Sequence, residues 1–209
     1  MTFASKPLIY YKVLGYAYKG EANMGKRVDP IRDTADIERI KEELSYCPRD
    51  LAIFTVGINV ALRAVDLLSI TVGQVKELSP GEYFFLTEKK TGKRRSVIIN
   101  EASHKAINAY LTTRTNAKDS DSLFLSRKGV RTPITRYWLN RMVQKWCQGI
   151  KGEFGSHTLR KTWGYHQRVQ FRTDTPTLMR AFNHSSEAQT LTYLGVEARD
   201  VHAAFMNVV

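Results

Sequence analysis

The chain has 209 residues and a formal net charge of +12, from 32 Lys or Arg against 20 Asp or Glu. This length suits one sizeable domain, alone or with a short arm, and an apolar content of 43% is ordinary for a globular core. There is no apolar run long enough for a membrane helix or a signal peptide, and Cys47 and Cys147 indicate reduced thiols in a cytosolic protein. The charge favours nucleic acid as the partner, with a merely basic soluble protein as the alternative.

The first third of the sequence predicts a basic arm and then two helices. Residues 1–33 mix tyrosines with lysines and arginines without a clear period, which indicates an arm. Thr34 is the expected cap of a helix over 35–45. Pro48 suits the first turn of a second helix, which reaches about Leu62 and is apolar almost all round, so we expect it to be buried.

A short helix over 67–75 and then a β-hairpin are expected next. Residues 83–89 and 95–99 read as extended runs around a turn with a glycine, and five of the seven residues 89–95 are Lys or Arg. A solvated turn whose lysines discourage aggregation is the alternative to a DNA contact, and both can hold. The hairpin cations predicted to contact DNA are Lys89, Lys93, Arg94 and Arg95.

The rest of the chain reads as helices joined by polar loops. Helices are expected over 101–113, from Thr132-Pro133 through Trp146, over 157–169, from Asp174 or Thr175, and after Ser186. The second of these carries Ile134, Trp138, Met142, Val143 and Trp146 on one broad face. Residues 34–209 therefore predict one mostly α-helical α+β domain with a small antiparallel sheet.

Two helix starts and the tail carry further expectations. Ser156 is expected to cap the helix over 157–169, and Ser186 with Gln189 predicts a capping box for the helix that bears Tyr193. Residues 197–209 are amphipathic, and we expect a helix that docks on a neighbouring protomer or, equally, on its own domain.

Histidine, arginine and tyrosine recur near the end of the chain. His157 and Arg160 are spaced i, i+3, so both project from one helix face, and arginine holds phosphate oxygens in a bidentate fork. Tyr193 follows His184 by nine residues, and the break at Ser185-Ser186 lets both reach one place. A tyrosine oxygen can act as a covalent nucleophile. Each of these residues alone also has an ordinary structural interpretation, such as a surface pair or a half-buried tyrosine.

Arg63 follows a nearly all-apolar helix, where an arginine is unusual unless it is paired or bound to an anion. Asp66, three residues further on, is expected to orient it. A local ion pair between the two without a further role is the alternative.

Together these residues resemble the tyrosine recombinase (phage integrase) family from about residue 34 onward. The matching parts are Arg63 within 61–68, Lys90-Thr91-Gly92, His157-Thr158-Leu159-Arg160, Asn183-His184-Ser185-Ser186, and Tyr193 at the family's nine-residue spacing. Phe182-Asn183 replaces the usual Leu-Gly, and Asp66 replaces the more usual glutamate. The short N-terminal part resembles short members without a separate core-binding domain, or an isolated catalytic domain.

The resemblance implies a site-specific recombinase that cuts and rejoins DNA through a 3′-phosphotyrosyl link on Tyr193. It implies that Arg63, Arg160 and His184 hold the phosphate, that Lys90 protonates the leaving 5′ oxygen, and that His157 assists proton transfer. No cofactor and no metal are expected.

The resemblance also implies partners. Double-stranded DNA is expected, with a homotetramer on synapsed DNA, and both a monomeric free protein and accessory DNA-bending proteins are left open. No membrane partner is expected, and the location is cytoplasmic and nucleoid-associated. Two other functions are weighed: a DNA-binding accessory protein without cleavage, and a type IB topoisomerase-like enzyme that relaxes DNA.

Overall fold

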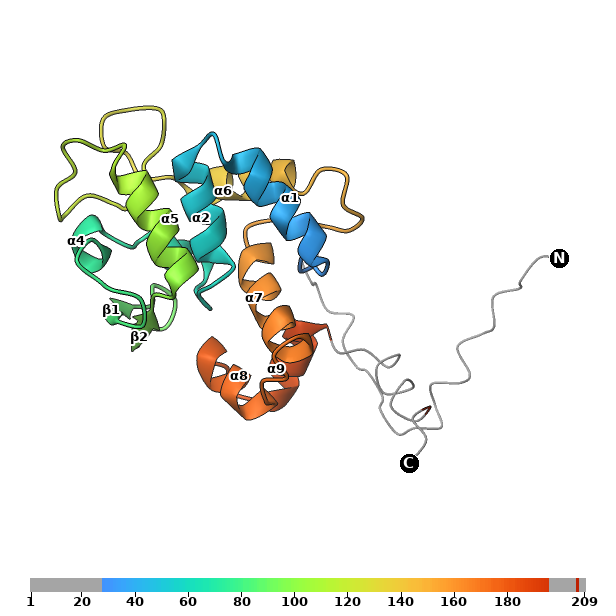
Figure 1. Ribbon diagram of the computed structural model, residues 1–209. Coiled ribbons are helices and arrows are strands. Elements are labelled where there is room, and N and C mark those ends of the chain that lie inside the picture. The colour runs from blue at the N-terminus through green and yellow to red at the C-terminus, as the bar shows by residue number, and fades with distance from the viewer. Residues whose placement is uncertain (1–27, 196–205, 207–209) are drawn as a thin grey trace.

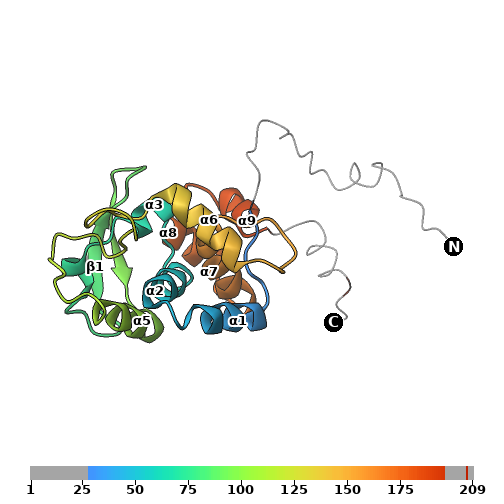
Figure 2. The same cartoon turned by 90° about the horizontal axis from the view of Figure 1, so that it is seen from above.

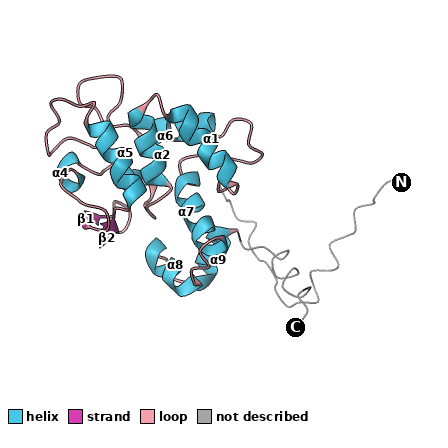
Figure 3. Cartoon of the chain, in the orientation of Figure 1, coloured by secondary structure: helices cyan, strands magenta, loops and turns pink. Residues whose placement is uncertain are grey.

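The computed structural model describes residues 28–195 and Met206, and its architecture is helical around one hairpin (Figure 1). In chain order the elements are α1 (Thr34–Leu44), α2 (Pro48–Gly57), α3 (Ala64–Leu67), α4 (Val72–Val75), β1 (Tyr83–Thr87), β2 (Arg94–Ile98), α5 (Glu101–Leu111), α6 (Arg136–Trp146), α7 (Thr158–Val169), α8 (Thr175–Phe182) and α9 (Glu187–Leu194). The predicted class, mostly α-helical with a small antiparallel sheet, is confirmed (Figure 3).

The described residues begin inside the predicted arm over 1–33, of which residues 1–27 are not described. Ile31 is fully buried, and its N–H donates to Thr162 Oγ1 at 2.9 Å. The carbonyl of Asp29 accepts from Thr158 Oγ1 at 2.9 Å, so this segment packs against α7. The predicted helix over 197–209 lies outside the described residues, apart from Met206.

The first two helices form where expected, with two corrections at their ends. Asp33 caps α1 in place of Thr34, because its carboxylate accepts the N–H of Ala35 at 2.8 Å. The second helix stops at Gly57 and does not continue to Leu62. Asn59 Nδ2 donates to the carbonyl of Thr55 at 2.8 Å, which satisfies one of the last helical carbonyls and competes with further helix.

The predicted helix over 67–75 was wrong in its extent. Two separate single turns are found instead, α3 and α4, interrupted where Thr71 becomes extended and pairs with Ser122 in an isolated bridge. Thr71 and Gln74 then form a capping box, which starts the second turn.

The hairpin is formed close to its predicted bounds, with Tyr83 opposite Ile98 and Thr87 opposite Arg94. Its burial alternates along the strand, so that Phe84 and Leu86 face the core. One face of this two-stranded sheet therefore packs on the domain, and the other faces solvent.

Two predictions about α6 were wrong. The helix begins at Arg136 with Thr135 as its cap, because Pro133 pairs with Leu125 in an isolated bridge and Ile134 donates its N–H to Phe124. Trp138 is not on the buried face and is 47% exposed. The residues of α6 that are buried are Leu139, Val143 and Trp146, spaced i, i+4, i+7.

The caps of α7 and α9 set where these two helices begin. Ser156 does not cap α7, which begins at Thr158 with His157 in the cap position and no side-chain cap bond. Ser186 caps α9 as predicted, accepting the N–H of Gln189 at 3.2 Å. The reciprocal bond is shifted by one residue, because Gln189 Oε1 accepts from the N–H of Ser185.

The buried apolar residues form a large cluster and a small one. The large cluster joins α1, α2, α5 and α6 with the hairpin, and Figures 1 and 2 show α2 between these helices. The small cluster packs α8 and α9 against α7, and Phe182 in this cluster is fully buried. Within residues 28–195, no helix is both long and apolar enough to cross a membrane.

We predict that Gly164→Ala destabilises the protein by about 1–3 kcal/mol. A Cβ at Gly164 would collide with the ring of Phe182 and lie 2.8 Å from Leu194 Cδ2, so α8 and α9 would have to move. Helix propensity alone would make the same change stabilising by about 0.5–1 kcal/mol. Urea unfolding measures the sign, with Val169→Ala, exposed at the end of the same helix, as a control expected to change little.

Candidate active site

Five segments carry the predicted catalytic residues: the turn before α3, the hairpin, the start of α7, the turn between α8 and α9, and α9 itself. Arg63 lies at the cap position of α3 in an extended conformation, and its side chain is 17% exposed. Its Nη1 lies 2.9 Å from Glu88 Oε2 and 3.9 Å from Asp66 Oδ2. The nearer partner of Arg63 is therefore Glu88, a residue for which the sequence suggested no role.

Glu88 is a buried carboxylate at the end of β1 with several polar partners. Its Oε2 accepts from Thr91 Oγ1 at 2.7 Å and from Asn183 Nδ2 at 2.9 Å, and its Oε1 accepts from Arg95 Nη1 at 3.4 Å. Burial opposes its ionisation, but these hydrogen bonds and the adjacent Arg63 outweigh it and lower the pKa of Glu88 to about 2. It is therefore charged at any physiological pH.

Asp66 is fully buried and anchors the hairpin more closely than it holds Arg63. Its Oδ1 accepts the backbone N–H of Lys89 at 2.8 Å. The predicted orienting role toward Arg63 thus corresponds to a loose pair at 3.9 Å, and a closer bond ties the lysine-bearing turn to α3.

Lys90 is exposed in the turn of the hairpin, beside Thr91. Among the other cations of the hairpin, Arg94 stacks on Phe85 with 3.7 Å between the guanidinium carbon and the ring centroid. Arg95 is half-buried and donates to the carbonyl of Ala61 at 3.3 Å, so one of its nitrogens is used internally. Their contact with DNA stays a prediction.

His157 and Arg160 are placed at the start of α7. His157 is at the surface, and its pKa is lowered by partial burial and by the nearby cations Arg160, Arg136, Lys161 and Arg63. Arg160 is buried, and its Nη2 donates to the carbonyl of Phe182 at 2.6 Å. Burial lowers the pKa of Arg160 to about 10, so it remains protonated at neutral pH.

His184 follows Asn183, which ends α8 in the left-handed conformation with φ 53° and ψ 46°. The imidazole stacks on Phe182 with 5.1 Å between ring centroids, and its Nδ1 lies 3.0 Å from Thr190 Oγ1. Burial and the charges of Arg160 and Arg63 lower the pKa of His184 to about 4. At neutral pH the ring is therefore neutral.

Tyr193 projects from α9 into the same place. Its ring centroid lies 5.4 Å from that of His184 and 5.8 Å from the guanidinium carbon of Arg160. Burial raises the pKa of Tyr193 to about 12, although Arg160 and Arg63 act in the opposite direction. The capped start of α9 thus brings the tyrosine to the histidine, as its nine-residue spacing predicts.

The site concentrates buried polar atoms that have no hydrogen-bond partner. Of six such side-chain atoms in the described part of the chain, five belong to the site: Arg63 Nη1, Asp66 Oδ2, Arg160 Nε, Arg160 Nη1 and Tyr193 Oη. Arg63 Nη1 is still ion-paired with Glu88 at 2.9 Å, so the donors without a charged partner are the two nitrogens of Arg160. Unpaired buried donors are costly, and arginines that carry them suit an oxyanion with several oxygens.

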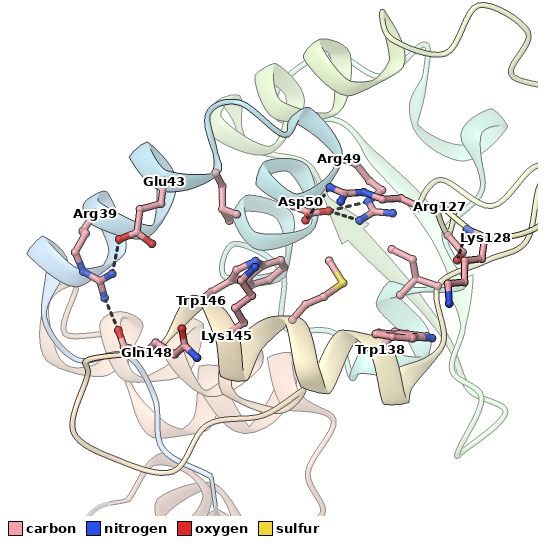
Figure 4. Close-up of a pocket in the computed structure, with 14 residues that line it drawn as sticks. Arg39, Glu43, Arg49, Asp50, Arg127, Lys128, Trp138, Lys145, Trp146 and Gln148 are labelled. Carbon is pink, nitrogen blue, oxygen red and sulfur yellow. Dashed lines mark hydrogen bonds and ion pairs between the residues drawn. The ribbon is translucent and has the colours of Figure 1, made fainter.

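No three His, Cys, Asp or Glu side chains gather as metal ligands among the described residues. A hollow of about 660 Å³ lies elsewhere, between α1, the start of α2, the loop 126–128 and α6. Figure 4 shows Trp138 and Trp146 of α6 on one side of it and Arg49, Asp50 and Arg127 on the other. None of the predicted catalytic residues lines this hollow.

The sequence did contain a signal for Glu88. Counting by two from Phe84 and Leu86, the inward positions of β1, reaches Glu88 at the end of the strand. An acid on the inner face, just before a run of cations, indicates a buried pair. Thr190, also fully buried, could not be found this way, because its partner His184 comes from the preceding turn.

Known proteins share both the sequence pattern and the fold. The pattern of the phage integrase family matches residues 33–199. The probable integrase/recombinase YoeC of Bacillus subtilis (strain 168) is 36% identical over 183 residues, which cover 85% of this chain and 95% of that protein. Tyrosine recombinase XerC of Caldanaerobacter subterraneus subsp. tengcongensis is 30% identical over 75% of this chain, which spans only 44% of that protein.

The solved structures of two recombinases are also similar. The crystal structure of XerA recombinase superposes with a TM-score of 0.70 at 22% identity, over 90% of this chain and 68% of that one. XerH site-specific recombinase, in a post-cleavage complex with its palindromic difH substrate, gives a TM-score of 0.68 at 18% identity, over 87% and 53%. These likenesses confirm the fold, and the match of pattern and of relatives shows that the chain belongs to the phage integrase family, which includes the tyrosine recombinases.

Proposed function

We propose that this protein is a site-specific recombinase in which Tyr193 attacks a DNA phosphodiester. The phenol oxygen forms a bond to phosphorus, and the bond from phosphorus to the 5′ oxygen breaks. A 3′-phosphotyrosyl link and a free 5′-hydroxyl result, and attack by the 5′-hydroxyl of another strand reverses the step and restores the phenol. The observation that carries the proposal is the pair of buried Arg160 nitrogens without a hydrogen-bond partner, Nε and Nη1, beside the buried Tyr193 Oη, which also lacks one.

The charges in the site suit a phosphate that gains negative charge. Arg63 and Arg160 are cations, while His184 is neutral at pH 7 because its pKa is about 4. The arginines then supply charge, and His184 supplies one hydrogen bond. Fixed donors aimed at developing charge in a site shielded from water typically contribute about 10²–10³ in rate each.

Two proton transfers complete the step. Tyr193 has a pKa of about 12, so its proton must be removed as it attacks. His157 is proposed as the acceptor, because its lowered pKa keeps the imidazole neutral and able to take a proton. Lys90, on the exposed turn of the hairpin, is proposed to give a proton to the leaving 5′ oxygen.

The Thr190 hydroxyl lies between two acceptors, His184 Nδ1 at 3.0 Å and the carbonyl of Ser186 at 3.4 Å, and its single proton can serve one of them. If it donates to the nearer Nδ1, the proton of the neutral ring is on Nε2. We propose this tautomer, because only an Nε2–H can donate to a phosphate on the open side of the ring.

The partners proposed are double-stranded DNA at the nucleoid and, for strand exchange, three further copies of the chain. The XerH structures contain difH substrate, and a lambda integrase structure contains a dimer bound to a COC′ core site. The net charge of +12 and the cations of the hairpin, Lys89, Lys93, Arg94 and Arg95, support the DNA contact.

We predict that Tyr193→Phe abolishes covalent linkage to DNA and changes DNA affinity by less than roughly threefold. A nicked duplex traps the adduct, because the short leaving strand diffuses away. Denaturing gels measure the adduct and mobility shifts measure affinity, with Tyr165→Phe on α7 as the control that keeps the adduct. An adduct in the Tyr193→Phe protein would refute the assignment, and joints between two duplexes separate recombination from DNA relaxation.

Thr190→Val should slow adduct formation by roughly 10-fold, since it removes one hydrogen bond that sets the donor in the site. Thr190→Ser keeps a hydroxyl and should remain within about threefold of the parent rate. Single-turnover cleavage of the nicked duplex measures both. Equal rates for the valine and serine variants would exclude the tautomer role.

The stability of the protein should fall as the pH is lowered from about 6.5 to 4. The folded-state pKa of His184 is about 4 and its ordinary value is about 6.5, so in this range the unfolded chain binds more protons. The contribution of His184 is complete above pH 6.5 and is lost toward pH 4. Thermal unfolding between pH 7.5 and 5 measures it, and the His184→Gln variant should show a flatter dependence than the parent protein.

A further inference from the structure

Glu88 links three of the segments that carry the proposed catalytic residues. One oxygen, Oε2, lies within 2.9 Å of Arg63 Nη1, Thr91 Oγ1 and Asn183 Nδ2. Its side chain is fully buried, so the charge has no water to replace a lost partner. Removing any one partner therefore leaves the others around an under-compensated buried charge.

On the side of Arg63, the contact fixes the guanidinium through one nitrogen only. The ion pairs of Arg63 within the described residues, with Glu88 and Asp66, both use Nη1. Nη2 and Nε take no part in these two pairs, so they can meet a phosphate in a bidentate fork while Nη1 stays beside Glu88.

On the side of the hairpin, the contact closes the turn that carries Lys90. The hydroxyl of Thr91 donates to the carboxylate of Glu88, and the N–H of Gly92 donates to the carbonyl of the same residue at 2.9 Å. Gly92 has a φ of 67°, which a glycine adopts without strain. Lys90 lies inside this turn, so the position of its backbone depends on Glu88.

On the third side, the contact holds the turn before His184. Asn183 stands where the family usually has glycine, and both residues adopt the left-handed backbone found here. Only asparagine offers a side-chain amide, and this amide donates to Glu88. The departure from the family pattern thus has a physical partner in the same chain.

We infer that Glu88 is a positioning residue of the active site, which joins Arg63, the turn that carries Lys90 and the turn before His184 through Asn183. The inference rests on the proposed function, because it assigns a role within that reaction. A competing role would have the opposite effect on cleavage. In that role, the carboxylate inhibits the site by occupying Arg63 until the DNA phosphate displaces it.

The test compares Glu88→Gln, Asn183→Gly and the double variant by single-turnover cleavage of a nicked duplex. Glu88→Gln keeps the shape and loses the charge, and we expect cleavage to slow by roughly 10- to 100-fold while the Kd for DNA stays within about threefold. Asn183→Gly keeps the backbone conformation and should slow cleavage by roughly 10-fold. The double variant should be no slower than Glu88→Gln, because both changes break one linkage.

Asp121→Asn is the matched control. Asp121 is also a shielded carboxylate, paired with Arg114 and Arg131, but it belongs to the loop after α5 and not to the site. Its substitution should change stability without slowing the cleavage by folded protein. Faster cleavage or tighter DNA binding by Glu88→Gln would overturn the positioning role in favour of the competing one, and additive effects in the double variant would overturn the linkage.

Hydrogen exchange tests the linkage without activity. In Glu88→Gln, the amides of Lys89 and Gly92 in the hairpin and of Asn183 and His184 after α8 should all exchange at least roughly threefold faster. Asp121→Asn should leave these four unchanged. If the parent protein forms no adduct on any DNA, the proposed function fails, whereas unchanged exchange in Glu88→Gln overturns the inference alone.

Discussion

Glu88 places a negative charge inside a protein whose net charge is strongly positive, and the site is arranged around it. Two cations, Arg63 and Arg95, face this carboxylate, together with two neutral donors. Without it, Arg63 would keep only the looser pair with Asp66 at 3.9 Å, and Arg95 would lose its ion pair before any phosphate is bound. Burial raises the pKa of Glu88, and the hydrogen bonds from Thr91 and Asn183 together with Arg63 lower it, to about 2. The same cations can therefore be held close together and still present free nitrogens to an anion.

The rest of the site is divided between the large core cluster and the small cluster that holds α8 and α9. The large core fixes α2 and, through it, the turn that bears Arg63, whereas α8 and α9 rest on a small cluster around Phe182. Arg160 connects the two clusters, because it belongs to α7 and donates to the carbonyl of Phe182 in the small cluster. The segment with His184 and Tyr193 is thus tied to the rest by a few polar contacts and one aromatic cluster, while Arg63, which we propose to bind phosphate, is held by the larger core.

Sequence reasoning reached most of the fold because periodic apolar patterns and capping residues act locally. It placed α1, α5, α7, α8, α9 and the hairpin within a few residues, and the motifs identified the family. It was wrong where distant partners decide: Thr71 breaks a predicted helix by pairing with Ser122, and Pro133 delays α6 by pairing with Leu125. Strand alternation could have indicated that Glu88 is buried, but its contact with Asn183, 95 residues away along the chain, could not be predicted.

The contrast between Asp66 and Glu88 explains why a motif alone cannot assign a role. Asp66 lies within the arginine box and was expected to orient Arg63, yet the closest contact of its carboxylate is with the backbone N–H of Lys89, at 2.8 Å. Glu88 lies outside every matching motif and has the shorter distance to Arg63. A carboxylate that orients an arginine can therefore come from a segment far from the arginine in sequence. In this chain, Asn183 stands where glycine is usual, and its amide donates to that carboxylate at 2.9 Å.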